Sequence, residues 1–307
     1  MSALPKVVAS SVIRGSQLGE SHGGLYLVNL DDGTAEQTLD WNRTDIDVSG
    51  RGGDRGLRGI AFHADRILVA SNAALLILDR EFQVLENHTH RYLQHCHEIC
   101  VVGDHVFLTS TGFDSLLTFD LRSRRFSHGF HLGAEDSSLK VRQFDPQGSG
   151  PAPSRRFHLN SIQANANDLW FSGLHTPGLL HLSPGGLSLA SPLPSGTHNA
   201  TQLQDGVIYN DTQADCVCYQ NSSGETLRMP VPAYDAAEIL NLDRFESSVA
   251  RPGFARGLCL LDAEHIAAGS SPSTICVYRL SDGRRVAQCN LSMDVRNAIH
   301  GLAVWPY

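Results

Sequence analysis

The chain has 307 residues, of which 41% are hydrophobic and 18% charged, so it has enough apolar material for a folded core and differs from disordered chains. Its formal net charge is -8 and its basic residues form no long run, which argues against nucleic acid or an anionic membrane as the main partner. No apolar stretch is long enough to cross a bilayer, and MSALPKVVAS lacks the apolar core of a secretion signal. We therefore expect a cytoplasmic protein.

The chain is built from repeated strand pairs. Three strands, expected at residues 6–13, 25–30 and 35–41, precede a glycine-rich link, SGRGGDRG. A phrase of two apolar strands around a polar turn then recurs, and it is clearest as HEICVVGDHVFLTS. Its copies begin at Arg58, His97, His158, His198 and Arg256, and a cut-off copy, IHGLAVWPY, closes the sequence. Alternating apolar residues between turn residues predict β-hairpins, and their repetition at roughly 40 residues predicts a propeller.

The number of blocks predicts the number of blades. Each copy continues into two further strands, which gives complete four-stranded blocks, while the start holds three strands and the end holds one. Pairing between the strand around Leu302 and the strand around Val8 would complete a shared blade and remove the open edges. We predict an all-β, six-bladed β-propeller, formed by residues 1–307 as a single domain. A two-sheet sandwich array would leave the incomplete first and last pieces unexplained.

Two blocks are longer than the others. The excess residues fall at 133–156 and 233–253, and both segments precede an innermost strand, so both are expected as loops on one face. Long loops on a rigid scaffold often carry function. The first segment is rich in Pro, Gly and Ser and is equally compatible with a disordered insertion. The second has a helical pattern and is interpreted as a lid.

The residues at the mouths of the innermost strands form a pattern. Aligning the copies on the apolar residue two places later gives Arg58, His97, Asn160, His198, Arg256 and His300. Histidine then occupies alternate blades, which predicts three imidazoles at the axis holding one divalent transition metal: Fe, Zn, Mn, Cu or Ni. A structural or channel-lining trio is the alternative. The fourth copy is one residue shorter, so His158 could take the place of Asn160.

The neighbours of this ring indicate an anionic substrate. Arg58 and Arg256 flank His300, and a guanidinium matches a carboxylate or phosphate in shape and charge. We expect these two residues and Asn160 to bind a small anion, unless each arginine pairs with an acid such as Asp54 or Glu98. Glu98 follows a predicted ligand, and it is interpreted as a support for the ligands or as a catalytic proton acceptor.

The cysteines receive a plainer interpretation. The chain has seven of them, and Cys216 and Cys218 lie in a predicted strand, CVCY. An odd number of thiols in an expected cytoplasmic protein favours reduced, mostly buried side chains.

The block pattern resembles six-bladed propellers of the kind that includes gluconolactonases, and more closely an uncharacterised group of bacterial propellers with His-rich inner strands. The resemblance covers the whole chain but consists of repeats and includes no catalytic signature. Gluconolactonase-like enzymes hold their metal with Glu, Asn and Asp, which this ring does not match. Oligogalacturonate lyases and carotenoid oxygenases are similar only in mounting metal-binding histidines on propellers, and theirs have seven blades.

Together, these patterns favour a metal-dependent lyase or hydrolase acting on a small carboxylate-type anion. A non-haem Fe(II) or Cu oxygenase with the same three histidines is the first alternative, and a non-enzymatic interaction module is the second. The sequence leaves open the metal, the substrate, the reaction type and the oligomeric state.

Overall fold

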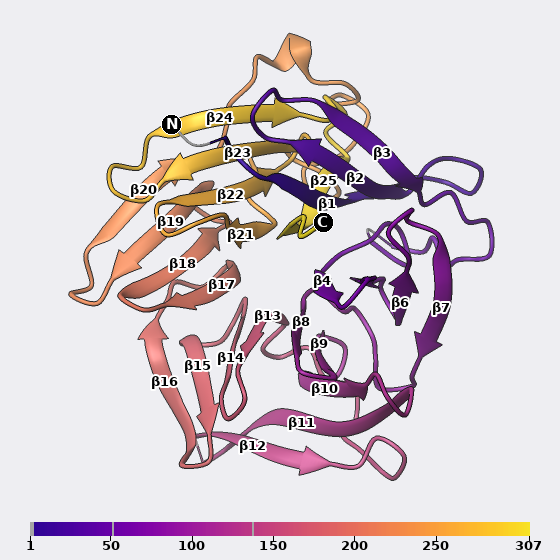
Figure 1. The fold of residues 1–307 in the computed structure, drawn as a ribbon, viewed down its shortest axis with the longest axis vertical. Coiled ribbons are helices and arrows are strands. Elements are labelled where there is room, and N and C mark those ends of the chain that lie inside the picture. The colour runs from indigo at the N-terminus through magenta and orange to yellow at the C-terminus, as the bar shows by residue number, and fades with distance from the viewer. Residues whose placement is uncertain (1–2, 51, 137) are drawn as a thin grey trace.

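The computed structural model describes residues 3–50, 52–136 and 138–307. It is a six-bladed β-propeller in which antiparallel sheets stand around one axis (Figure 1). Each blade runs outward from an innermost strand, and the chain passes from the rim of one blade to the axis of the next (Figure 1). The predicted fold class is therefore confirmed.

The strands of the blades follow the chain in order. Blade 1 contains β25 (Asn297–Val304), β1 (Lys6–Ile13), β2 (Gly23–Asn29) and β3 (Ala35–Asp40). Blade 2 contains β4 (Ile60–His63), β5 (Arg66–Ala70), β6 (Ala74–Leu78) and β7 (Val84–Thr89). Blade 3 contains β8 (Ile99–Val102), β9 (His105–Ser110), β10 (Ser115–Asp120), β11 (Arg125–Glu135) and β12 (Ser138–Phe144).

The second half of the ring has the same plan. Blade 4 contains β13 (Leu159–Ala164), β14 (Leu169–Gly173), β15 (Gly178–Ser183) and β16 (Gly186–Pro192). Blade 5 contains β17 (Thr197–Leu203), β18 (Gly206–Asp211), β19 (Cys216–Asn221) and β20 (Thr226–Pro230). Blade 6 contains β21 (Leu258–Leu260), β22 (His265–Ser270), β23 (Thr274–Arg279) and β24 (Arg285–Asn290).

The ring is closed by the two ends of the chain. β25 pairs antiparallel with β1, and Leu302 lies opposite Ala9, as predicted. The register shifts beside Ser10, which leaves His300 as the extra residue of a bulge in β25. Ser10 joins the closure to blade 2, because its hydroxyl donates to the Arg58 carbonyl and accepts the Gly301 N–H. This closure holds Arg58 and His300 on a fixed frame.

Apolar side chains fill the spaces between neighbouring blades. One cluster joins Leu68 and Leu75 of blade 2 to Ile99 and Leu108 of blade 3. Burying each such side chain stabilises the fold by about 1.5–3 kcal/mol, and both faces of the inner strands are covered in this way. The scaffold around the axis is therefore packed on all sides.

Two predictions about the long segments were wrong. Residues 133–156 are not all loop, since they include the end of β11 and the whole of β12, which pairs with β11 as a fifth strand at the rim of blade 3 (Figure 1). The segment 233–253 has only a short 3-10 helix, η1 (Ala236–Glu238). Leu240 in this segment forms an isolated β-bridge with the backbone of residues 293–295, and turns follow it. The expected helical lid is therefore absent from this segment. Among the described residues, no helix is long and apolar enough to span a membrane.

Candidate functional site at the propeller axis

A cavity of about 640 Å³ lies against the mouths of the inner strands. Its wall is rich in cationic and imidazole side chains, namely Arg14, Arg58, Arg155, Arg256, His95, His97, His158 and His300. Asp47 is the carboxylate that lines it, and the glycine-rich link contributes Gly50, Gly52 and Gly53. A concave wall with this balance of charge concentrates anions.

Three imidazoles gather around that of His97. Its ring centroid lies 5.2 Å from that of His158, 6.2 Å from that of His198 and 6.1 Å from that of His300. The rings of His158 and His198 are 6.4 Å apart. His198 stands behind the cavity wall, and its Nε2 atom is buried without a hydrogen-bond partner among the described residues. The structure thus brings together the three predicted histidines and adds a fourth.

The cavity is lined by His158 and not by Asn160. Asn160 is fully buried, and its amide donates to the Thr197 carbonyl oxygen across 2.9 Å. Asn160 is the extra residue of a bulge in β13, the place that His300 holds in β25, but its side chain turns to Thr197, and His158, two residues earlier, lines the cavity. The placement of Asn160 at the cavity is corrected to His158.

Asp114 turns His158 toward the axis. Its buried carboxylate accepts hydrogen bonds from the backbone N–H groups of Arg156, Phe157 and His158 and from the Ser154 hydroxyl. His158 itself has a φ of 54°, a conformation that a non-glycine residue adopts only when its surroundings impose it. No sequence pattern indicates that Asp114 positions His158, because Asp114 does not open a repeat.

Arg58 is a buried cation without a complete set of partners. Its side chain is 5% exposed, and its Nε and Nη1 atoms have no hydrogen-bond partner in the part of the chain that the structure describes. Its Nη2 atom makes one long contact, 3.4 Å, with the Gly53 carbonyl oxygen. Burial lowers the pKa of Arg58 to about 10, so it remains a cation at neutral pH. The alternative, an ion pair with Asp54 or Glu98, does not form.

Arg256 is held between His300 and an aromatic ring. Its Nη1 atom lies 2.9 Å from Nε2 of His300, and its guanidinium carbon lies 4.9 Å from the centroid of Phe254. The same ring carries Arg14 and Arg251 at 5.2 Å and 4.9 Å. Stacking of this kind orients a guanidinium and leaves its edge available for hydrogen bonds. Arg14 and Phe254 were missed by the sequence, since neither opens a repeat.

The imidazoles are neutral at physiological pH. Burial, followed by the charge of neighbouring arginines and imidazoles, holds the pKa of His97, His198 and His300 well below its usual value. Burial and then the charge on Arg256 lower the pKa of His158 to about 4. Neutral rings accept protons or bind metals, and a bound anion would raise these pKa values again.

Glu98 lies in the channel wall and does not line the cavity. Its Oε2 atom accepts a hydrogen bond of 3.2 Å from Asn199 of blade 5, so the contact crosses the axis. The side-chain oxygen of Asn199 accepts in turn from the Gly257 N–H of blade 6. Burial raises the pKa of Glu98 to about 8, and the Asn199 bond offsets part of that rise. Glu98 contacts Asn199 and is not among the residues that line the cavity, so its role as a proton acceptor stays a prediction.

The imidazole nitrogens are not yet spaced as metal ligands. Two nitrogens on a tetrahedral metal at about 2.1 Å lie about 3.4 Å from each other. Among the described residues, no three of the axial histidines bring their ring nitrogens within 4.8 Å of one another. In addition, the Arg256 guanidinium donates to His300 Nε2, the nitrogen closest to it.

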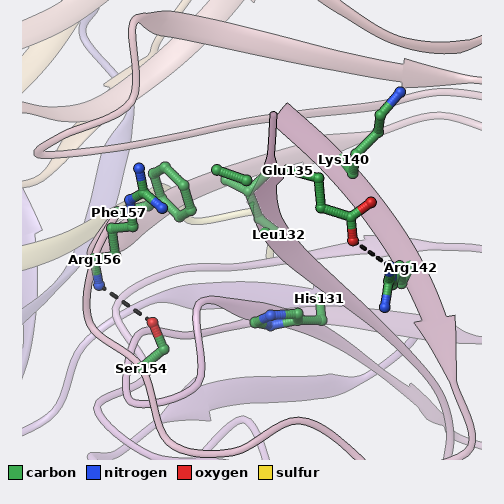
Figure 2. Close-up of a pocket in the computed structure, with 10 residues that line it drawn as sticks. His131, Leu132, Glu135, Lys140, Arg142, Ser154, Arg156 and Phe157 are labelled. Carbon is green, nitrogen blue, oxygen red and sulfur yellow. Dashed lines mark hydrogen bonds and ion pairs between the residues drawn. The ribbon is translucent and has the colours of Figure 1, made fainter. Parts of the chain in front are cut away.

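A second, smaller cavity of about 290 Å³ lies under the β11–β12 hairpin (Figure 2). The extended segment that carries Arg155 to the axial cavity points the next residue, Arg156, into this one. Figure 2 shows that Glu135 and Arg142 on its wall form an ion pair. Its one carboxylate is thus engaged by Arg142, and it is less than half the volume of the axial cavity, which is the stronger candidate.

No family model and no curated protein matches the chain. Solved structures share its fold. A protein of unknown function from Bacteroides caccae has 13% sequence identity, with 99% of this chain and 100% of that chain covered at a TM-score of 0.57. The computationally designed protein Ika8 has 9% identity over 97% of this chain and 91% of that one, at a TM-score of 0.50. Virginiamycin B lyase from Staphylococcus aureus has 11% identity, 84% and 77% coverage and a TM-score of 0.47. These likenesses show the propeller fold alone, and the expected resemblance to a His-rich group is not confirmed.

Proposed function

We propose that the protein is an enzyme that binds a small anionic substrate in the axial cavity and catalyses an elimination or a hydrolysis. The observation that carries the proposal is Arg58, a buried cation whose Nε and Nη1 atoms have no hydrogen-bond partner among the described residues, beside neutral imidazoles. A buried charge without partners destabilises a fold, and a ligand of opposite charge removes that cost when it binds.

The cavity supports this proposal by its size and its wall. Its volume, about 640 Å³, lies within the range typical of small-molecule sites. Arg58 approaches it from blade 2 and Arg256 from blade 6, and these two blades flank blade 1, which carries His300. Their planar guanidinium groups match two oxygens of a carboxylate or phosphate.

The imidazoles supply acid–base chemistry. His97 and His158 line the cavity as neutral rings, so either can accept a proton from the substrate. In an elimination, one ring takes the proton beside the carboxylate and becomes an imidazolium, and the C–H electron pair forms the double bond. The leaving group departs with the electron pair of its own bond and receives the proton from that imidazolium. Proton transfer of this kind contributes about 10²–10⁴ in rate. The arginines stabilise the charge that develops on the carboxylate.

A divalent transition metal remains a separate proposal. His97, His158 and His198 would hold it, because the centroids of their rings lie within 6.4 Å of one another in every pairing. In addition, Nε2 of His198 has no hydrogen-bond partner among the described residues. Bound there, a metal would polarise a carboxylate and lower the pKa of a water. The three rings must turn to meet it, and His300 of the predicted trio is engaged by Arg256.

The activity is tested with a panel of small hydroxy acids, dicarboxylates and phosphate esters, followed by proton NMR. We expect wild type to convert one class, His97→Ala and His158→Ala to lose turnover, and Arg58→Gln to raise KM. His105→Ala is the matched control, since His105 is an exposed histidine of β9. Turnover that survives in both histidine variants, or a panel left wholly unconverted, contradicts the proposal.

The metal is tested without reference to activity. The protein is stripped with a chelator and titrated with Zn²⁺ or Fe²⁺ by calorimetry. With Cys216 and Cys218 replaced by serine in every protein tested, so that thiols bind no metal, binding should disappear in His198→Ala and persist in His105→Ala. Oxygen consumption by the Fe²⁺-loaded protein separates the oxygenase alternative from hydrolysis or elimination. Equal binding in His198→Ala and wild type rules out the imidazole site.

A further inference from the structure

A second group of potential ligands lies in blade 5, where β18 ends and β19 begins. Asp211 is paired directly with Cys216, and Cys218 follows two residues later on the same face of the sheet. All three side chains are buried: Asp211 is 5%, Cys216 4% and Cys218 0% exposed. This face packs among apolar residues such as Leu179 and Leu193. A carboxylate and two thiols in such surroundings require a compensating partner.

The spacing of the sulfurs is that of a metal site. The two Sγ atoms are 3.5 Å apart, and one ligand atom from each of the three residues lies within 4.8 Å of the others. Two sulfurs on a tetrahedral zinc at about 2.3 Å are about 3.8 Å apart, whereas a disulfide requires about 2.05 Å. The distance between the two sulfurs is therefore within a few tenths of an ångström of that in a zinc site.

The groups around the cluster complete it in charge and orientation. Asp211 Oδ1 accepts the backbone N–H groups of Gln213 and Ala214, which fixes the carboxylate. Arg228 approaches Asp211 Oδ2 at 3.6 Å and Cys216 Sγ at 3.9 Å. Two thiolates and a carboxylate carry three negative charges, which a divalent cation and this guanidinium balance. Arg228 is 59% exposed in its side chain, so a path to solvent runs beside it.

We propose that Asp211, Cys216 and Cys218 form a binding site for a thiophilic divalent cation, with Zn²⁺ as the best match. Tyr209 lies opposite Cys218 and its side chain hydrogen-bonds to that sulfur, so its phenol is the nearest further oxygen to the three ligands named here. When the metal binds, each thiol releases its proton to solvent and forms a metal–sulfur bond. The site cross-links β18 and β19 and shares no ligand with the axial imidazoles.

The pH dependence of binding follows from the state of the thiols. A thiol binds a metal as a thiolate, so each cysteine must lose its proton when the metal enters. Metal binding must displace protons, and its apparent affinity rises with pH.

The experiment is a Co²⁺ titration of the chelator-stripped full chain, followed by absorption spectroscopy. We expect a sulfur-to-cobalt charge-transfer band that saturates at one equivalent and is bleached by Zn²⁺. Cys216→Ser and Cys218→Ser should lose the band, and Cys289→Ser, a buried cysteine of blade 6, should keep it. His198→Ala should also keep it, which separates this site from the axial imidazoles.

Three results overturn the inference: no charge-transfer band in wild type, a band that persists in both cysteine variants, or a Cys216–Cys218 disulfide in the purified protein by mass spectrometry. Asp211→Asn guards against variants that fail to fold. It keeps both sulfurs and should shift the titration to higher Co²⁺ concentration without abolishing the band. An unchanged midpoint excludes the carboxylate as a ligand and contradicts the site as proposed.

Discussion

The Nη1 atom of Arg256 donates a hydrogen bond of 2.9 Å to Nε2 of His300. A cation donating to this nitrogen requires a neutral ring that carries its proton on Nδ1. The two residues open neighbouring repeats in the sequence, and ring closure brings them together. His300, which the sequence predicts as a metal ligand, is therefore the hydrogen-bond partner of Arg256, which the sequence predicts as a substrate-binding residue.

The first prediction concerns this pair. After burial, the charge on Arg256 is the strongest influence that lowers the pKa of His300 and of His198. Arg256→Gln should raise both values, as measured by NMR titration of the imidazole C–H signals. Arg122→Gln, which removes a guanidinium with an 82% exposed side chain, should leave them unchanged. Identical titration curves in wild type and Arg256→Gln would show that the guanidinium does not act on these rings.

The second prediction is a dependence of stability on pH. The axial histidines have folded pKa values below the unfolded value of about 6.5, and that of His158 is about 4. The unfolded chain therefore binds more protons between these limits, and the free energy of unfolding falls as pH is lowered from 7 to 4. His198→Gln should lose part of this dependence in urea titrations, because it removes one group whose pKa is lowered in the folded state. A slope equal to that of wild type would refute the depressed pKa.

The third prediction has the opposite sign. Glu98 has a folded pKa of about 8, above its unfolded value, so its contribution is complete at low pH and is lost as pH rises through 8. Glu98→Gln removes the ionisation but retains a side chain that can bond to Asn199. Its Tm should match wild type near pH 5 and exceed it at pH 9. A Tm difference that does not change with pH would mean that Glu98 is charged throughout.

The fourth prediction tests the closure of the ring. Deleting residues 298–307 removes most of β25, bares the edge of β1 and takes Ile299 and Leu302 out of the core. Each of these two side chains contributes about 1.5–3 kcal/mol, against a typical total of 5–15 kcal/mol. We expect no cooperative melting in circular dichroism. Deleting only residues 306 and 307 leaves β25 intact and should preserve the transition, and a normal melt of the longer deletion would contradict the closure.

The fold was predictable because the strands of each repeat are visible in the local alternation of its apolar residues. The alternation of apolar residues in HEICVVGDHVFLTS fixes β8 and β9, and the incomplete first and last repeats fix the shared blade. The strand β12 was not predictable from the repeat, because only its pairing with β11 distinguishes it from a loop. Its Lys140 and Arg142 alternate with half-buried neighbours only in that context.

The site was predictable in part, for the same reason. Repeat alignment places Arg58, His97 and His300 on the cavity. It fails at Asn160, although Asn160 and His300 occupy equivalent bulge positions, because the Asn160 amide bonds to the Thr197 carbonyl oxygen and His158, with a φ of 54°, lines the cavity instead. Arg14 and Phe254 reach the axis from segments outside the repeated phrase. Their contribution depends on how the loops cross the ring, which no local pattern encodes.

The most direct test of the proposed function measures whether the axial cavity binds anions through Arg58. Small carboxylates, dicarboxylates and phosphates are titrated by calorimetry into wild type, Arg58→Gln and the exposed control Arg122→Gln. A charge-assisted hydrogen bond contributes about 1.5–3 kcal/mol, so Arg58→Gln should weaken binding about 10–100-fold while Arg122→Gln binds as wild type does. Without ligand, Arg58→Gln should be at least as stable as wild type, because a buried, incompletely paired charge is gone. Equal anion affinity in all three proteins, or no anion binding by wild type, would contradict the account.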